Sequence, residues 1–378
     1  MADQGPSASY RVAVLPGDGI GPEVIAEARA TLELASRLGG FGVEVETFEA
    51  GGAHHLAAGE PMGADVIERV AEFDAMLAGP FGDPRVPDRV VLWGTILKLR
   101  QRFDQYVNLR PARSLPGVPG ALRTLQDARL DIVVVRENTE GEYSGAGGRV
   151  HRGSAGEVAL ETAVFTRVGT ERVIRYAFEY ARAQGRRRVT SATKSNALRH
   201  AMPFWDEVMD EVSGDYPELE RESVLIDALA ARVVSDPTSL DVIVASNLFG
   251  DVLSDLTAAA AGSLGTAPSA NLDPSRSHPS LFQAIHGSAP DIAGRGIANP
   301  VAEILSVALM LEFLGEGACA AAIERAVDAS TAQAHTRTRD LGGSADTRAA
   351  GEATRASLEA ALASVGAGGT ARTAGLPG

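Results

Sequence analysis

Short apolar runs alternate with amphipathic helical stretches along most of this chain. The first run, in YRVAVLPGDG from Tyr10 onward, predicts a buried strand that enters a glycine-rich turn. Pro22 fits the first turn of a following helix, which Gly39 ends. Further apolar runs predict strands at 43–50, 73–79, 131–135, 187–193 and 241–246. Strands that alternate with helices imply an α/β fold, with a largely parallel sheet covered on both faces.

Two segments depart from this alternation. Residues 148–166 alternate like strands with glycine in the turn, which predicts a projecting hairpin that pairs with a second subunit. Residues 365–378 carry too little apolar material to pack, so we expect a mobile tail there. The sequence has no internal repeat and no long linker, so any domain division arises where the chain crosses between lobes.

Composition and charge narrow the class of protein. The 378 residues are 45% hydrophobic, enough for a large core and for two or three domains. The formal charge of −14 argues against nonspecific binding to nucleic acid or to an anionic membrane, although local arginines can still bind an anionic substrate. Cys319 is the only cysteine, so an internal disulfide is excluded. Without a secretion signal or an apolar run of roughly 20 residues, we expect a soluble cytoplasmic protein.

An acidic pair stands out in DVIVASNLFGDVLSDL, residues 241–256. The apolar run leads through a turn into a helical pattern that places Asp251 and Asp255 one turn apart on one face. Like charges at this spacing repel by a few tenths of a kcal/mol, and a hard cation such as Mg²⁺ between them would convert repulsion into ligation. The alternative is that both carboxylates simply complement the positive end of the helix dipole.

A set of arginines suits a small dicarboxylate. Arg100 and Arg110 would not share a face of one helix, but Pro111 favours an extended Arg110, so a helix followed by a strand would let them converge. Arg136 directly follows the apolar run 131–135, at the strand end where open α/β sheets bind ligands. Each guanidinium can bind a carboxylate in a bidentate manner. Taken singly, each arginine is more often an ordinary surface residue.

Tyr143 and Lys194 are candidates for proton transfer. Lys194 ends a strand-like run, and neighbouring positive charges would lower its pKa enough to make it a proton acceptor. Each residue alone is more often structural. The glycine-rich loop 286–300 would let the backbone approach a phosphate-bearing ligand closely. PGDGIGPE, residues 16–23, matches neither the dinucleotide fingerprint nor the P-loop, so we reject both phosphate sites there.

Together these segments resemble the β-decarboxylating dehydrogenases of the isocitrate/isopropylmalate dehydrogenase family. The resemblance runs from Tyr10 to about Thr347 and is carried by LPGDGIGPEV, NLRP, VVRENTEGEYS, SATKSN, SNLFGDVLSDL and HGSAPDIAGRGIANP, in family order. The WG of VLWGTILKLR, the DQYVNLRP run and SANLDP look most like the tartrate/D-malate branch.

The resemblance implies a two-lobed isopropylmalate-dehydrogenase-like fold, distinct from the Rossmann fold. Residues 1–108 and 262–364 would form a large cofactor-binding lobe. Residues 109–261 would form a smaller lobe for substrate binding and dimerisation, and it would carry the projecting arm. The protein would be a homodimer whose active sites are shared between subunits.

The resemblance also implies a role for each matching residue. Tyr143 would protonate the product, and Lys194 from the neighbouring subunit would deprotonate the hydroxyl. Mg²⁺ or Mn²⁺ would be held by Asp251 and Asp255 with Asp227 of the neighbour, and a monovalent cation such as K⁺ is a further candidate. Substrate would contact Arg100, Arg110, Arg136, Ile96 and Leu97. NAD would contact Asn196, His286, Gly287, Ser288, Ala289, Pro290, Asp291, Ile292 and Asn299.

The implied reaction is NAD-linked oxidative decarboxylation of a 2-hydroxy diacid. D-malate is the expected substrate, and tartrate is the next candidate. The apolar Ile96 and Leu97 would also admit an isopropyl group, so 3-isopropylmalate is the nearest alternative. A non-catalytic regulatory paralogue is the alternative of a different class. One departure stands out, because Gln283 occupies the position where the family usually has a glutamate, three residues before the loop histidine.

Overall fold

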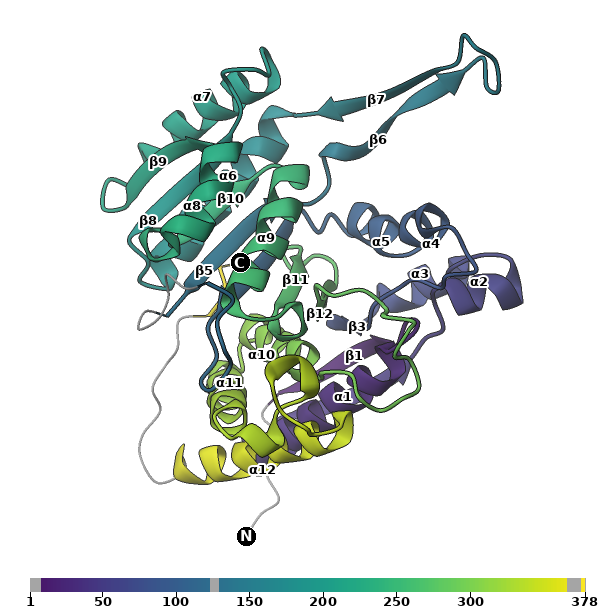
Figure 1. Ribbon diagram of the computed structural model, residues 1–378, viewed down its shortest axis with the longest axis vertical. Coiled ribbons are helices and arrows are strands. Elements are labelled where there is room, and N and C mark those ends of the chain that lie inside the picture. Colours follow the sequence, from purple (N-terminus) through teal and green to yellow (C-terminus); the bar gives the residue numbers. More distant parts are fainter. Residues whose placement is uncertain (1–7, 123–128, 366–374, 378) are drawn as a thin grey trace.

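The computed structural model describes residues 8–122, 129–365 and 375–377. Within these residues, ten strands form one large sheet in the order β2-β1-β3-β12-β11-β4-β5-β10-β8-β9 (Figure 1). Along the sheet their bounds are β2 Gly42–Thr47, β1 Ser9–Leu15, β3 Ala75–Ala78, β12 Ser280–Ala284, β11 Pro268–Leu272, β4 Val107–Arg113, β5 Asp131–Glu137, β10 Val242–Ala245, β8 Arg188–Thr193 and β9 Glu220–Leu225.

The sheet consists of two parallel blocks that run in opposite directions. Strands β2, β1, β3 and β12 form one block, and β5, β10, β8 and β9 form the other. Between the blocks, β11 is antiparallel to both β12 and β4, and β4 is antiparallel to β5. The predicted α/β fold is confirmed, and the sheet expected to be largely parallel has an antiparallel centre at β11 and β4.

Helices cover both faces of the sheet (Figure 1). Alternate residues of a strand point to opposite faces. In β5, Val133 and Val135 belong to the apolar cluster that holds side chains of α1, α6, α7, α10 and α11, whereas Ile132 and Val134 belong to the cluster of α8 and α9. The helices are α1 Gly21–Gly39, α2 Gly52–Ala58, α3 Ala64–Val70, α4 Asp88–Gly94, α5 Ile96–Arg102, α6 Arg167–Ala183, α7 Ala201–Ser213, α8 Ile226–Ser235, α9 Asn247–Ala261, α10 Val301–Leu314, α11 Gly317–Thr331 and α12 Thr347–Val365.

The lobe boundary expected from the sequence falls at the centre of the sheet. Strands β1, β2, β3, β11 and β12 come from the two segments of the expected large lobe, and β5, β8, β9 and β10 come from the expected smaller lobe. Strand β4 begins at the boundary itself and pairs with β11 on one side and β5 on the other. The assignment of cofactor binding and dimerisation to separate lobes stays a prediction.

An antiparallel hairpin of β6 (Gly141–Val150) and β7 (Val158–Val164) projects far from the body (Figure 1). It begins before the arm expected at 148–166, because β6 includes the segment that carries Tyr143. Val150, Val158 and Leu160 are exposed on it.

At the other end of the chain, Leu376 is buried and belongs to the main apolar cluster, which differs from the mobile tail expected over 365–378. The rest of that tail, 366–374 and 378, lies outside the described residues. No helix in the described part of the chain is long and apolar enough to cross a membrane.

Candidate functional site

Three arginines from separate elements converge on one cavity. Arg100 lies in α5, Arg110 in β4 and Arg136 in β5, and all three side chains are buried. The helix-then-strand arrangement that Pro111 predicts is the one observed, since Arg110 is extended. Asn108 lies opposite Arg136 in the antiparallel register, so Arg110 and Arg136 fall two residues apart on one face of the sheet.

Asp251 of α9 faces these arginines. Its Oδ1 lies 3.2 Å from Arg110 Nη1 and also forms an ion pair with Arg136 Nη1, while its Oδ2 accepts a 2.9 Å hydrogen bond from the Tyr143 hydroxyl. Burial would raise the pKa of Asp251, but the positive charges of Arg136 and Arg110 outweigh burial and lower that pKa. This carboxylate is therefore held ionised at the centre of the cavity.

Asp255 lies one turn further along the same helix. Its Oδ1 is 3.7 Å from Arg110 Nη1, and its side chain is more exposed than that of Asp251. Burial raises the pKa of Asp255, and the negative charge of Asp251 adds to this effect against the charge of Arg110. The two carboxylates thus share a face of α9, as the spacing predicts. The carboxyl group of Asp255 is the more easily protonated of the two.

Buried polar side chains fix the arginines in place. Arg110 donates to Asn108 through Nε and to Ser254 Oγ through Nη1 at 2.7 Å. Arg136 donates to Asn247 Oδ1 from both Nε, at 3.1 Å, and Nη2, at 2.6 Å. The sequence analysis did not single out these supporting residues, although each lies within a motif already recognised, NLRP or SNLFGDVLSDL. Their polar character at otherwise apolar positions was the available signal.

Arg100 differs from the other two arginines because it has no carboxylate partner. Among the described residues it forms no ion pair, and its Nε is buried without a hydrogen-bond partner. Burial lowers the pKa of Arg100, and the charges of Arg136 and Arg110 lower it further. A buried guanidinium without an ion-pair partner is costly, so Arg100 is suited to bind an anion that the described residues do not supply.

The cavity around these groups has a volume of about 240 Å³. Its apolar wall includes Ile96 and Leu97, the residues expected to face the substrate's variable substituent, together with Leu92. Gln283 also lines it, so the departure from the family pattern lies inside the site. The remaining lining residues are Pro80, Phe81, Arg100, Arg110, Arg136, Tyr143, Asp251, Ala284, Ile285, His286 and Gly287.

The loop expected to hold the cofactor begins at the rim of this cavity. His286 and Gly287 line the cavity and also a second one of about 560 Å³, together with Ala289, Ile292 and Asn299. Burial lowers the pKa of His286, whose Nε2 has no hydrogen-bond partner within the described residues. Gly287, Ser288, Ala289 and Pro290 of the same loop also line a third cavity, of about 780 Å³. Asp291 is exposed next to these residues.

The rejected glycine motif at 16–23 supports this loop. The Ile20 amide donates to the Ser288 carbonyl at 2.9 Å, and a Cβ on Gly19 would lie 2.0 Å from that carbonyl oxygen, so only glycine fits. Buried Asp18 accepts hydrogen bonds of 2.7, 2.9 and 2.8 Å from the amides of Gly52, Ala53 and Gly82. The motif thus joins several loops, a role that the sequence analysis missed.

A family model described as isocitrate/isopropylmalate dehydrogenase matches residues 11–356. The chain belongs to this family. Membership makes the protein a decarboxylating dehydrogenase, an oxidoreductase, and the resemblance drawn from the motifs is confirmed.

Individual relatives narrow the comparison. A D-malate dehydrogenase (decarboxylating) of Escherichia coli is 51% identical over 311 residues, 82% of this chain and 86% of the relative. A tartrate dehydrogenase/decarboxylase of Pseudomonas putida is 50% identical over 315 residues, with the same shares of 82% and 86%. The crystal structure of isocitrate dehydrogenase from Methylococcus capsulatus superposes with a TM-score of 0.84 at 36% identity, covering 92% of this chain and 99% of that one.

Not every residue expected in the decarboxylating dehydrogenase site lies at the arginine cavity. Lys194 follows β8, and its Nζ lies 2.6 Å from Asp227 Oδ1 in the first turn of α8. The hydrogen bond from Lys194 lowers the pKa of Asp227. Lys194, Asn196 and Asp227 are not among the residues that line the arginine cavity or the two cavities beside the loop. Instead of the positive neighbours expected from the sequence, Lys194 pairs with a carboxylate.

The acidic residues present fit a divalent ion in part. The described residues contain no group of three or more His, Cys, Asp or Glu side chains placed to hold a metal. Asp251 and Asp255 nevertheless offer carboxylate oxygens on one helix face, and Mg²⁺ is commonly held by one or two carboxylates together with water and substrate oxygens. One chain would therefore supply two carboxylate ligands, and a complete site would need oxygens from substrate or from a second chain.

Proposed function

We propose that this enzyme catalyses the metal-dependent, NAD-linked oxidative decarboxylation of a 2-hydroxy diacid, chiefly D-malate to pyruvate and CO₂. The observation that carries the proposal is Arg100, a buried guanidinium without a carboxylate partner in the described chain, beside Arg110 and Arg136. A diacid would supply the missing negative charges, and a volume of about 240 Å³ suits a small one. The names of relatives at 50% and 51% identity favour D-malate and tartrate.

The chain's own residues would divide the reaction between them. Arg100, Arg110 and Arg136 would bind and orient the two substrate carboxylates. Lys194 of the partner subunit would take the 2-hydroxyl proton, directly or through water, as hydride leaves carbon 2. After CO₂ departs, Tyr143 would donate its phenol proton to the carbon atom that had carried the lost carboxylate. Burial, together with the Asp251 charge, raises the pKa of Tyr143 and so keeps that proton in place.

The cofactor and the metal ion would bind at the sites already described. The loop with His286, Asp291, Ile292 and Asn299 would hold NAD, which accepts the hydride when bound, and Asn196 would lie near the nicotinamide. Asp251 and Asp255, with Asp227 of the partner subunit, would hold Mg²⁺ or Mn²⁺, whose Lewis acidity stabilises negative charge developing on the substrate oxygen. These assignments require a homodimer with shared active sites.

Two rival functions make different predictions. The apolar wall of Ile96, Leu97 and Leu92 leaves 3-isopropylmalate as an alternative substrate. A non-catalytic regulatory paralogue would be expected to lack a reacting group, yet Tyr143, Lys194, the three arginines and the acidic pair are all present. Gln283 is the single departure at a matched position.

A substrate panel followed by NADH absorbance tests the proposal. We expect the highest kcat/KM with D-malate, then tartrate, and a much lower value with 3-isopropylmalate. Arg100→Gln should lower kcat/KM for D-malate by roughly 100-fold, because a charge-assisted contact is lost. The matched control is Arg102→Gln on the same helix, which removes an exposed guanidinium and should leave activity intact. A dominant 3-isopropylmalate activity, or no turnover of any diacid, would contradict the proposal.

A further inference from the structure

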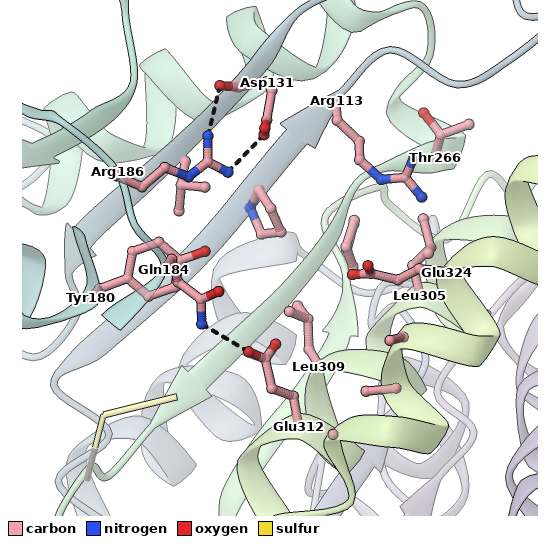
Figure 2. Close-up of a pocket in the computed structure, with 16 residues that line it drawn as sticks. Arg113, Asp131, Tyr180, Gln184, Arg186, Thr266, Leu305, Leu309, Glu312 and Glu324 are labelled. Carbon is pink, nitrogen blue, oxygen red and sulfur yellow. Dashed lines mark hydrogen bonds and ion pairs between the residues drawn. The ribbon is translucent and has the colours of Figure 1, made fainter. Parts of the chain in front are cut away.

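Another cavity, of about 250 Å³, is shown in Figure 2. It lies on the face of the sheet opposite the arginine cavity, and we call it the far-face cavity. Side chains alternate along β4 and β5, so Arg110 and Arg136 face the arginine cavity, whereas Pro111 and Val133 face the far-face cavity. Helices α6, α10 and α11 complete its walls, which bring together segments far apart in the sequence. No step of the proposed reaction uses this cavity.

The cavity has more negative charge than its basic residues neutralise. Its arginines are already paired, Arg113 with Asp328 at 2.6 Å and Arg186 with Asp131 at 2.8 Å. Glu312 accepts a 3.0 Å hydrogen bond from the neutral amide of Gln184 and forms no ion pair in the described chain.

Glu324 is exposed at the rim of the cavity and has no hydrogen bond or ion pair with any described residue. Two carboxylates thus border one cavity without a counter-cation.

Tyr180 supplies an independent sign of a ligand. Its side chain is buried, at 7% exposure, and its hydroxyl has no hydrogen-bond partner among the described residues. The charged groups that act on the phenol include Arg186, Glu312, Asp131 and Glu324, all of which line this cavity. The hydroxyl therefore lies among the charged groups of this cavity, where it can accept a hydrogen bond from a ligand.

We propose that this cavity binds a small organic cation, a primary ammonium group carried on a short hydrocarbon body. An ammonium has three N–H donors, and the cavity offers three acceptors in Glu312, Glu324 and the Tyr180 hydroxyl. The apolar wall of Pro111, Val133, Pro268, Leu305 and Leu309 would receive the hydrocarbon part. The inference is independent of the reaction proposed for the first cavity.

The charge of Glu312 makes the binding dependent on pH. Burial raises its pKa to about 7, the negative charge of Glu324 adds to this, and the Gln184 hydrogen bond opposes it. Other titratable groups also line the cavity: Arg113 of β4, Asp131 of β5, Tyr180 of α6 and Arg186, which follows α6. Tyr176 of α6 also lies near Glu312. Because a cation favours the ionised carboxylate, affinity should rise roughly tenfold from pH 6 to pH 8.

Calorimetric titration of the full chain with n-butylammonium tests this, with n-butanol as the neutral probe and butyrate as the anionic probe. An alkylammonium stays protonated over this pH range, since amine pKa values lie at about 10. Of the three probes, we expect only n-butylammonium to bind, with a millimolar or lower Kd. Its affinity should fall roughly tenfold in both Glu312→Gln and Glu324→Gln, and by less in Tyr180→Phe.

Glu218→Gln, which removes an exposed carboxylate on another part of the surface, should bind like the unaltered protein. Glu324 is exposed, so its variant should fold even if Glu312→Gln does not. Absence of binding, equal binding of n-butanol, or unchanged affinity in Glu324→Gln would overturn the inference.

Discussion

The hydroxyl of Tyr143 lies 2.9 Å from Oδ2 of Asp251, the carboxylate that also binds Arg110 and Arg136. One aspartate therefore joins the proposed proton donor to the proposed substrate arginines. Since Asp251 is also the proposed metal ligand, a change at this position should affect several steps at once, whereas a change at Tyr143 should affect one.

Tyr143→Phe should lower kcat by roughly 100- to 10,000-fold with little change in KM for the diacid, because only the proton donor is lost. Rapid-quench detection of CO₂ and NADH should show that oxidation survives better than completion of the reaction. The raised pKa of Tyr143 predicts that its proton remains available throughout the neutral range. A variant with full kcat would remove Tyr143 from the mechanism.

Asp251→Asn should be close to inactive while still folded by circular dichroism, because one metal ligand and the counter-charge of two buried arginines are lost together.

Dialysis of the unaltered enzyme against a chelator should abolish turnover, and Mg²⁺ or Mn²⁺ should restore it. Binding of Mn²⁺ followed by electron paramagnetic resonance gives a readout apart from activity and should weaken in Asp255→Asn too. Full activity after rigorous metal removal would disprove the metal requirement.

Cofactor choice should depend on Asp291. Its carboxylate, exposed beside the proposed cofactor loop, would accept hydrogen bonds from a free ribose 2′-hydroxyl and repel a 2′-phosphate. The unaltered enzyme should therefore have a higher kcat/KM with NAD⁺ than with NADP⁺, and Asp291→Lys should reduce that ratio. Equal values for the two cofactors would mean that Asp291 does not contact the ribose.

Shared active sites predict complementation between two inactive variants. Arg110→Ala should damage a site in cis, and Lys194→Ala should damage the partner's site in trans, so a heterodimer of the two would have one intact site. Random reassortment after joint refolding gives about half heterodimers, which should restore roughly a quarter of normal activity. Each variant refolded alone is the control, and activity no higher than that of the controls despite confirmed subunit exchange would rule out sharing.

Glu303 of α10 should make stability fall as pH rises. It is fully buried, neither oxygen makes a well-formed hydrogen bond in the described chain, and burial raises its pKa from 4.5 to about 8, slightly opposed by the Ala284 backbone. The folded protein holds this proton while the unfolded chain releases it above pH 4.5, so stability is lost between about pH 4.5 and 8.

Glu303→Gln should remove this penalty, on the order of 3 kcal/mol at pH 7, and raise the Tm at pH 7 while changing it little at pH 4.5. Thermal unfolding across that pH range, with Glu218→Gln as the control, measures the difference. An unchanged pH dependence in Glu303→Gln would show that another group is responsible.

The sequence by itself determined the elements whose local pattern is strong. The apolar runs of β1, β5 and β10, the Pro22-to-Gly39 helix and the acidic face of α9 follow from periodicity and from proline and glycine chemistry. The extended Arg110 follows from Pro111 in the same way. The motifs then indicated the family without any knowledge of contacts.

Tertiary structure decided the features that depend on partners distant in the sequence. Strands β9, β11 and β12 are short and carry polar residues, and β11 takes its conformation from pairing with β12 and β4, so no local period marks it. Only folding leaves Arg100 without an ion pair in the described part of the chain. Only folding also packs α6, α10 and α11 over the far face of β4 and β5, where they form the far-face cavity. Burial and charge balance are properties of the whole packing arrangement, because each is set by side chains that many different segments bring to one place.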